Sequence, residues 1–428
     1  MAHTSNIKKT VLQNGLRVIL IPMAQSLSAS VLILVEAGSE YETKNINGLS
    51  HFLEHMMFKG TTNRPRVGQI AEELAGLGAQ SNAFTSQEYT GYWAKAEKHK
   101  LPKILDIVSD LYLNPIFNPE EIEKERGVII EEINMYEDTP MRKVGEVFNS
   151  LLYGDQPAGW DVAGKKEIIG KVSKSDFVKY RGAHYIPNKT VLVVAGNFNE
   201  KSALRQIKSY FDGLKRKGKI AKEKTKEFQK KPAIFAKFKE SDQSHLVLGV
   251  RAFDIFDGRR YALQVLADVL GGGMSSRLFK KVREELGAAY YVNAGVDLFL
   301  DHGYFAASAG VDHAKIEKVI SAILREMKRL KEEPVPEKEL QRSKDHLVGN
   351  LILSLETPDE LAGFYGEQEI LTRKTLTPKV LVGRIQEIQA RELRDVARTI
   401  FRAEKLNLAV IGPYKKGDVF KKLLTANL

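Results

Sequence analysis

The spacing of apolar and polar residues predicts a chain of alternating strands and helices. In residues 47–60 the apolar positions follow the helical repeat and form one stripe, made by Leu49, Phe52, Leu53, Met56 and Met57. Residues 80–97 instead alternate and are rich in Thr, Tyr and Phe, which is typical of strands. A long helix is expected from Pro119 to about Tyr136, because Asn118 suits the N-cap and Pro suits the first turn.

The order of predicted elements restarts in the second half of the chain. The matching pairs are 244–252 with 28–37, 260–270 with the 47–60 helix, 286–309 with the strands around 78–96, 337–355 with 120–136, and 407–412 with 190–196. Two tandem copies of one α/β unit of about 200 residues explain this pattern and agree with usual domain sizes. We therefore predict domains at 1–214 and 233–428, joined by a Lys-rich linker at 215–232.

Composition narrows the class of protein. The chain has 428 residues, no cysteine and a net charge of +11, so disulfides, thiolate zinc sites and cysteine nucleophiles are excluded. Residues 215–231 hold nine Lys or Arg and two Glu, which is +7 of that charge, and we interpret this run as a solvated linker rather than a nucleic-acid site. No apolar run approaches the roughly 18 residues of a membrane helix, and the start of the chain lacks an export signal, so a cytoplasmic protein is expected.

The most informative chemistry lies on the predicted helix at 47–60. His51, Glu54 and His55 gather on the side opposite the apolar stripe, one helical turn apart. Two imidazoles at this spacing can bind one Zn²⁺, and a carboxylate beside them can take a proton from water on the metal. A pair of solvated surface histidines explains the helix alone equally well. The second copy has no His or Glu at these places, so any such site is expected in one half only.

A zinc site needs a third protein ligand, and the long helix from Pro119 offers glutamates. If the isoleucines of this helix form its buried stripe, Glu131 points into solvent, whereas Glu125 and Glu132 lie along the edge of the stripe. Two turns, about 10 Å of rise, separate Glu125 from Glu132, so the two are not expected to bind one ion together.

The motif His51-x-x-Glu54-His55, followed after 76 residues by Glu132 within residues 125–132, resembles the pitrilysin/insulysin metallopeptidase family, the inverzincins. The resemblance covers essentially the whole chain, including the duplication, and is strongest to the mitochondrial processing peptidase branch and its short bacterial relatives. It implies a mixed α+β fold in which each of two tandem domains has a mostly antiparallel sheet covered by helices. It also implies a zinc endopeptidase or oligopeptidase that hydrolyses extended or unfolded peptides.

The family's functional residues transfer to matching positions. His51, His55 and Glu132 correspond to the ligands of one Zn²⁺ per chain, and Glu54 corresponds to the general base. The glutamate that matches Glu125 supports the site without binding the metal.

Two further segments resemble parts of the family's active site. Arg283 and Tyr290 match an arginine and a tyrosine that the second domain supplies, and such groups would stabilise the oxyanion at the substrate carbonyl. Without the family match, an ion-paired arginine and a half-buried tyrosine would be the better interpretation. A third match, made by Asn82, Ala83, Phe84 and Thr85, resembles the edge strand on which relatives hold the substrate backbone by β-augmentation.

Several expectations concern partners and alternatives. Long relatives have four such domains around a closed chamber and this chain has two, so we predict a dimer with a second copy or a paralogue. The rival hypothesis is a non-catalytic scaffold or the inactive partner of a heterodimeric peptidase.

Two further features are given no functional role. Gly271–Gly273 is too short for the glycine-rich loop of the processing peptidase's non-catalytic subunit. His184 is expected to pack ahead of a strand rather than bind metal.

Overall fold

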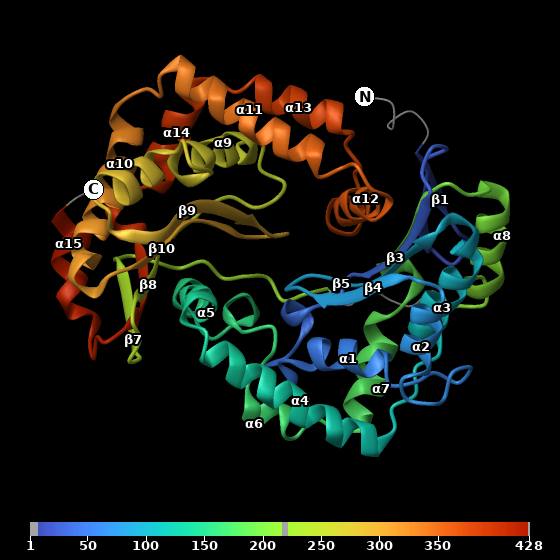
Figure 1. Cartoon of the computed structure of the whole chain (residues 1–428). Coiled ribbons are helices and arrows are strands. Elements are labelled where there is room, and N and C mark those ends of the chain that lie inside the picture. The colour runs from blue at the N-terminus through green and yellow to red at the C-terminus, as the bar shows by residue number, and fades with distance from the viewer. Residues whose placement is uncertain (1–6, 216–220, 427–428) are drawn as a thin grey trace. The chain divides into compact units, whose positions relative to one another are not determined.

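The computed structural model describes residues 7–215 and 221–426 (Figure 1). They form two compact units. Unit 1 comprises the described residues of 7–133, 161–223 and 352–378, and unit 2 comprises those of 134–160, 224–351 and 379–426. Among the described residues, no helix has the length and apolar character that crossing a bilayer requires.

Unit 1 is built on a six-stranded sheet in the order β1-β2-β6-β3-β5-β4. Its strands are β1 (Lys8–Val11), β2 (Arg17–Pro22), β3 (Ser28–Val35), β4 (Gln80–Thr85), β5 (Thr90–Glu97) and β6 (Thr190–Gly196). All neighbours are antiparallel except β2 and β6. Among the strands that the structure describes, β4 pairs only with β5, so its outer edge is free of other described strands of the unit.

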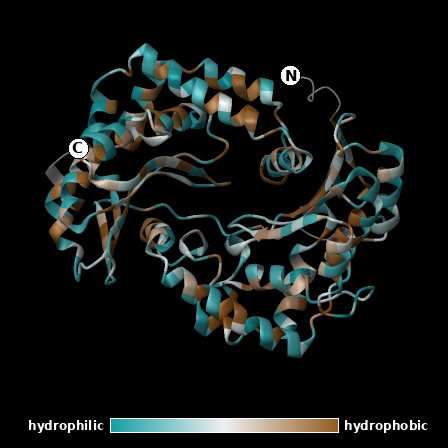
Figure 2. Cartoon of the chain, in the orientation of Figure 1, coloured by the Kyte–Doolittle hydropathy of each residue, from teal (hydrophilic) through white to brown (hydrophobic). Residues whose placement is uncertain are grey.

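Helices cover both faces of this sheet. They are α1 (Leu49–Met57), α2 (Gln69–Gly76), α3 (Leu101–Leu113), α4 (Pro119–Glu137), α6 (Lys166–Ile169), α7 (Lys174–His184), α8 (Glu200–Phe211) and α12 (Pro358–Thr372). Helix α3 packs on β3 and β5, and α1 lies against β4. Helix α12 covers β2, β6 and β3 from the opposite face (Figure 1). The helices carry both apolar and polar residues, as expected for helices that turn an apolar side to a sheet and a polar side to solvent (Figure 2).

Unit 2 repeats this plan with five strands in the order β7-β11-β8-β10-β9. They are β7 (Ala233–Phe238), β8 (Ser244–Arg251), β9 (Ala289–Leu298), β10 (Gly303–Val311) and β11 (Asn407–Gly412). Its helices are α5 (Pro140–Tyr153), α9 (Arg260–Gly271), α10 (Ile316–Glu332), α11 (Glu337–Leu353), α13 (Pro378–Gln386), α14 (Ala390–Ile400) and α15 (Lys421–Ala426). Only β7 and β11 are parallel, so the predicted mixed α+β fold with mostly antiparallel sheets is confirmed for both copies.

The compact units differ from the predicted sequence domains because two equivalent segments are exchanged. Helix α5 lies in the first half of the sequence but packs on β8 and β11 of unit 2, and α12 lies in the second half but belongs to unit 1. Both helices begin at a Thr-Pro step, Thr139-Pro140 and Thr357-Pro358. In unit 1, buried Arg17 of β2 donates to the backbone carbonyl of Glu369 in α12 at 2.8 Å, which holds the exchanged helix to the sheet.

Residues 216–220 of the predicted linker lie outside the described residues. Most of its described residues are exposed, as predicted, but Lys222 is an exception. Its side chain is 8% exposed and forms ion pairs with Glu40 and Glu88, two buried carboxylates of unit 1. The linker is therefore attached to unit 1 at this residue and is not a uniformly solvated run.

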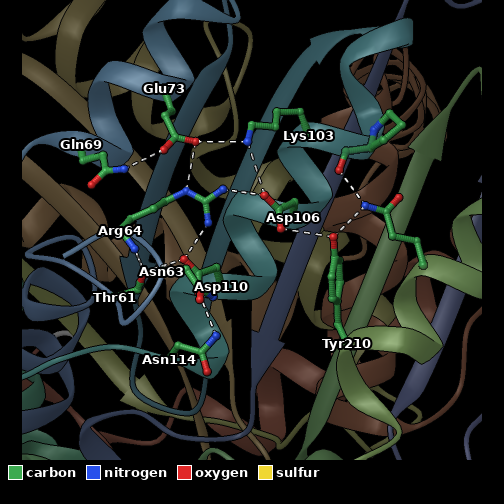
Figure 3. A network of polar contacts seen from close by, with 12 residues as sticks. Thr61, Asn63, Arg64, Gln69, Glu73, Lys103, Asp106, Asp110, Asn114 and Tyr210 are labelled. Carbon is green, nitrogen blue, oxygen red and sulfur yellow. Dashed lines mark hydrogen bonds and ion pairs between the residues drawn. The ribbon is translucent and has the colours of Figure 1, made fainter. Parts of the chain in front are cut away.

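The loop that follows α1 is held by a buried ion network (Figure 3). Arg64, which is 5% exposed, forms ion pairs with Glu73 of α2 and with Asp106 and Asp110 of α3. Asp110 also accepts a hydrogen bond from Thr61 at 2.5 Å. Burial acts against the ionised form of Asp110, but these hydrogen bonds outweigh it and lower its pKa. The exit of α1 is thus tied to α2 and α3.

We expect Arg64→Ala to lower the free energy of unfolding by about 3 kcal/mol, because it leaves buried Asp110 without its cation. Thermal and urea unfolding measure this. The matched control is Arg66→Ala, because Arg66 and its partner Glu72 are both more than 60% exposed. It should leave stability unchanged within error. Equal effects of the two substitutions would contradict a structural role for the network.

Candidate metal centre

Helix α1 presents three polar side chains because its apolar stripe is completely buried. Leu49, Phe52, Leu53, Met56 and Met57 are all 0% exposed. His51, Glu54 and His55 are therefore turned away from the core, where each is only partly covered. The rings of His51 and His55 lie 4.7 Å apart between centroids, as side chains one turn apart should.

The start of α1 is fixed by a buried carboxylate, Glu42. It accepts hydrogen bonds from the backbone N–H groups of Gly48 (2.8 Å) and Ser50 (2.6 Å) and from the side-chain amide of Asn47 (3.0 Å). Gly48 has a φ of +96°, which favours glycine at this helix entry. Burial raises the pKa of Glu42 to about 7, although the three donors act in the opposite direction. Glu42 thus satisfies N–H groups that the first turn cannot pair itself.

Glu132 of α4 meets the two histidines of α1. Its Oε2 lies 3.6 Å from His51 Nε2 and 3.6 Å from His55 Nε2, and ligand atoms of the three residues lie within 4.8 Å of one another. Tetrahedral Zn²⁺, with bonds of about 2.0–2.1 Å, keeps its ligand atoms roughly 3.4 Å apart. These three side chains fit one zinc ion. Glu131, in contrast, is exposed, as its position on the helix predicts.

Glu125 lies behind His55 and is itself held by a lysine. Its Oε1 lies 2.9 Å from His55 Nδ1, and its Oε2 lies 2.5 Å from the ammonium of Lys59. Burial acts to raise the pKa of Glu125, but the bonds to His55 and Lys59 dominate and lower it. An ionised Glu125 accepts a hydrogen bond from the Nδ1–H group of His55, so the lone pair of His55 Nε2 faces His51 and Glu132.

Glu54 connects this centre to strand β4. The hydroxyl of Thr85 donates to Glu54 Oε2 at 2.6 Å. Burial raises the pKa of Glu54 above its ordinary value, and the Thr85 bond only partly offsets this. A carboxylate with a raised pKa is a better proton acceptor than an exposed one.

The predicted substrate-binding residues occupy the free-edge strand β4. Ala83 and Thr85 face α1, while Asn82 and Phe84 face the side of the sheet that α12 covers, because side chains alternate along a strand. The N–H of Ala83 donates to the side-chain oxygen of Asn82 at 2.9 Å. The side chain of Asn82 thus satisfies one backbone N–H group of the free edge. Unpaired N–H groups on an edge strand can otherwise pair with another chain and lead to aggregation.

Arg283 and Tyr290 lie together in unit 2. Arg283 is on a π-helical turn, η6 (Phe279–Glu285), and its guanidinium donates to the backbone carbonyl of Tyr290 at 2.9 Å. The side chain of Tyr290, at the start of β9, is 75% exposed. Both side chains are therefore accessible, and π-helical turns occur frequently at functional sites.

Two supporting residues escaped the sequence interpretation. Lys59 could have been found, because it stands four residues after His55 within the helix predicted at 47–60, although α1 itself ends at Met57. Glu42 could not, because it lies in an irregular loop whose contacts no periodic pattern encodes. His184, expected to pack rather than bind metal, is buried between Tyr41 and Tyr180, and burial lowers its pKa to about 4. The expected packing of His184 agrees with this position.

Comparisons with known proteins agree with this geometry. Residues 17–166 match the family model "Insulinase (Peptidase family M16)", and residues 171–347 match "Peptidase M16 inactive domain". The uncharacterized zinc protease YmxG of Bacillus subtilis is 34% identical over 407 residues, which cover 95% of this chain and 98% of that protein. The chain belongs to peptidase family M16.

Other similar proteins extend over the same length. An uncharacterized zinc protease of Rickettsia felis is 34% identical over 422 residues, which are 96% of this M16 chain and 98% of the relative. A solved structure of a protease from Helicobacter pylori has a TM-score of 0.88 and 22% identity, and covers 95% of this chain and 99% of its own. It shows that the fold is shared. The resemblance to the pitrilysin/insulysin family is confirmed.

We expect Glu125→Gln to weaken zinc binding about 10- to 100-fold, because His55 loses the carboxylate that orients it. Lys59→Met should weaken binding in the same direction, and Lys59→Arg should restore it. Competition against a chromophoric chelator measures each dissociation constant. Lys124→Met is the matched control, because that exposed lysine of α4 pairs with Glu121 and not with Glu125. Unchanged zinc affinity in Glu125→Gln would contradict the orienting role.

Proposed function

We propose that this chain is a zinc-dependent endopeptidase that hydrolyses peptide bonds in extended or unfolded peptides. The observation that carries the proposal is the meeting of His51, His55 and Glu132 beside Glu54. Two imidazoles and one carboxylate are a common ligand set of catalytic zinc, which keeps a fourth position for water or substrate. Membership of a peptidase family and relatives named zinc proteases support the same reaction class.

In this proposal the side chains have distinct roles. His51, His55 and Glu132 hold one Zn²⁺ per chain, and Glu125 orients His55 from behind. A zinc ion bound there would supply Lewis acidity, lowering the pKa of water and polarising the peptide carbonyl. Glu54 accepts the proton of the attacking water and delivers it to the leaving amine. The hydroxyl of Thr85 keeps one oxygen of Glu54 in a fixed position for this transfer.

Strand β4 is proposed to bind the substrate backbone. A peptide added to its free edge would continue the sheet along residues 82–85, replacing the side chain of Asn82 at the N–H of Ala83, and would pass beside Glu54, because Thr85 contacts that residue. Pairing of this kind needs an extended substrate backbone. It therefore favours unfolded peptides over folded proteins.

Arg283 and Tyr290 are proposed to contact the substrate carbonyl and stabilise the developing negative charge. The support is their match to the family's active-site segment and their accessibility in unit 2. The proposed assembly is a dimer, because this chain carries two of the four domains found in long relatives.

We expect Glu54→Gln to retain about one zinc per chain while turnover falls about 10²- to 10⁴-fold, because the general base is lost and the ligands are not. Metal analysis and hydrolysis of quenched peptides measure the two properties. Glu131→Gln is the matched control, because this exposed glutamate stands beside Glu132, and it should keep both. Activity of Glu54→Gln equal to that of an active wild type would contradict the role of Glu54 as general base. Wild-type protein with neither zinc nor peptide hydrolysis would favour the non-catalytic scaffold.

For the second domain, Arg283→Ala and Tyr290→Phe should each lower turnover about 10²- to 10³-fold and leave the zinc content unchanged. Kinetics with one quenched peptide and metal analysis of the same samples measure this. Lys281→Ala serves as the control, because Lys281 lies on the same π-helical turn and forms an exposed ion pair with Glu285. Loss of zinc from the first two variants would instead assign them a structural role.

The dimer is tested by light scattering of active protein during size exclusion. The expected mass is twice the 48.0 kDa of the chain. A fully active species with the mass of one chain would refute the proposed assembly.

A further inference from the structure

A cavity of about 220 Å³ lies in unit 1 beside the flank of α12. The sheet contributes Leu32 and Leu34 of β3, Trp93 of β5 and Phe84 of β4, and α12 contributes Gly363. The cavity exists because α12 covers β2, β6 and β3 but does not extend over β5 and β4 in the same way. Its position is therefore on the sheet face opposite to the metal centre.

Strand β4 relates this cavity to the metal centre through the alternation of its side chains. Thr85 contacts Glu54 on one face of the strand, while Phe84, its neighbour, lines the cavity on the other. A peptide paired with the free edge of β4 would lie about 4.8 Å from it and would alternate in the same way. Every second side chain of that peptide would then lie on the cavity side of the sheet, and the one opposite Phe84 would stand next to the ring that forms the cavity wall nearest to the edge.

The lining indicates what kind of side chain the cavity accepts. Its carboxylates already have partners within the unit: Asp359 pairs with Lys95 at 2.9 Å, Glu360 accepts from Thr357 at 2.9 Å, and Glu367 is hydrogen-bonded to Tyr89. Apart from Gly363 and Ser30, whose hydroxyl donates to the backbone carbonyl of Ala94, the remaining surface is that of leucines and aromatic rings. An apolar cavity of roughly 150 Å³ already binds benzene, so 220 Å³ suffices for a large side chain.

We propose that this cavity is a specificity subsite that takes a large apolar side chain, aromatic or branched aliphatic, from a substrate strand on β4. The inference rests on the proposed peptidase function and adds a substrate preference to it. Burial of such a side chain against Phe84 and Trp93 favours binding through removal of apolar surface from water. Acidic side chains are disfavoured, because the carboxylates of α12 stand close by.

Gly363 allows the cavity to be filled without disturbing the fold. A Cβ atom added there meets no atom within 4 Å, and the position lies inside a helix, where leucine is more favourable than glycine. Gly363→Leu therefore narrows the cavity, and Gly363→Ala narrows it less. Gly383→Leu is the matched control, because Gly383 also lies in a helix, α13, with nothing within 4 Å of its added Cβ.

The test uses quenched peptides that differ at a single position, with Phe, Leu, Ala, Lys or Glu there, and mass spectrometry to identify the bond cleaved. For wild type we expect kcat/KM about 10-fold or more higher for Phe or Leu than for Ala at one position. Gly363→Leu should reduce this ratio at least 5-fold, Gly363→Ala should reduce it less, and Gly383→Leu should leave it unchanged. Zinc content should be the same in all four proteins.

Two results would overturn the subsite: a ratio that Gly363→Leu leaves unchanged, or a wild-type preference for Lys or Glu at the position where Phe was expected. Cleavage of none of the peptides by zinc-loaded wild type would reject the proposed function and the subsite with it. Cleavage without the predicted preference rejects the subsite alone.

Discussion

The metal centre depends on the orientation of α1, which burial of one helix face sets. Five apolar side chains of this nine-residue helix are fully buried, so rotation about its axis would expose them. Both ends are also held, the first turn by Glu42 and the exit loop by Arg64. With its rotation and its ends fixed, α1 can present His51 and His55 to Glu132 at separations close to those of a tetrahedral zinc site.

Carboxylates have four different roles within unit 1, and their surroundings explain the differences. Glu42 is buried among neutral donors, and its pKa is raised to about 7. Glu125 shares its oxygens between His55 and Lys59, and its pKa is lowered. Glu54 is covered and has one hydroxyl partner, so its pKa is raised. Glu132 alone among them lies between both imidazoles. Similar side chains thus have surroundings that suit a helix cap in one case and the proposed orienting group, proton acceptor and metal ligand in the others.

The exchange of α5 and α12 makes each unit depend on both halves of the sequence. The sheet of unit 1 buries apolar residues of β3 and β6 under α12, a helix that begins after residue 357. The sheet of unit 2 likewise buries Val247 and Ile411 under α5. A sheet with one bare apolar face is unstable in water, so neither half of the chain is expected to fold alone. The exchange also creates the cavity at the flank of α12.

Local patterns in the sequence were enough to predict the strands and helices, the duplication, the buried stripe of α1 and the outward direction of Glu131. These features depend on residues a few positions apart, whose spacing determines which face of an element they share. The motif His51-x-x-Glu54-His55 also identified candidate residues for zinc chemistry. Contacts between distant segments were not predictable in this way. The cap from Glu42, the bond from Thr85 to Glu54 and the exchanged helices arise when elements pack, and packing depends on the combined shape of many side chains. Residues 47–60 therefore specified a helix with two histidines, but the packing of α1 against α4 and β4 determined which groups surround them.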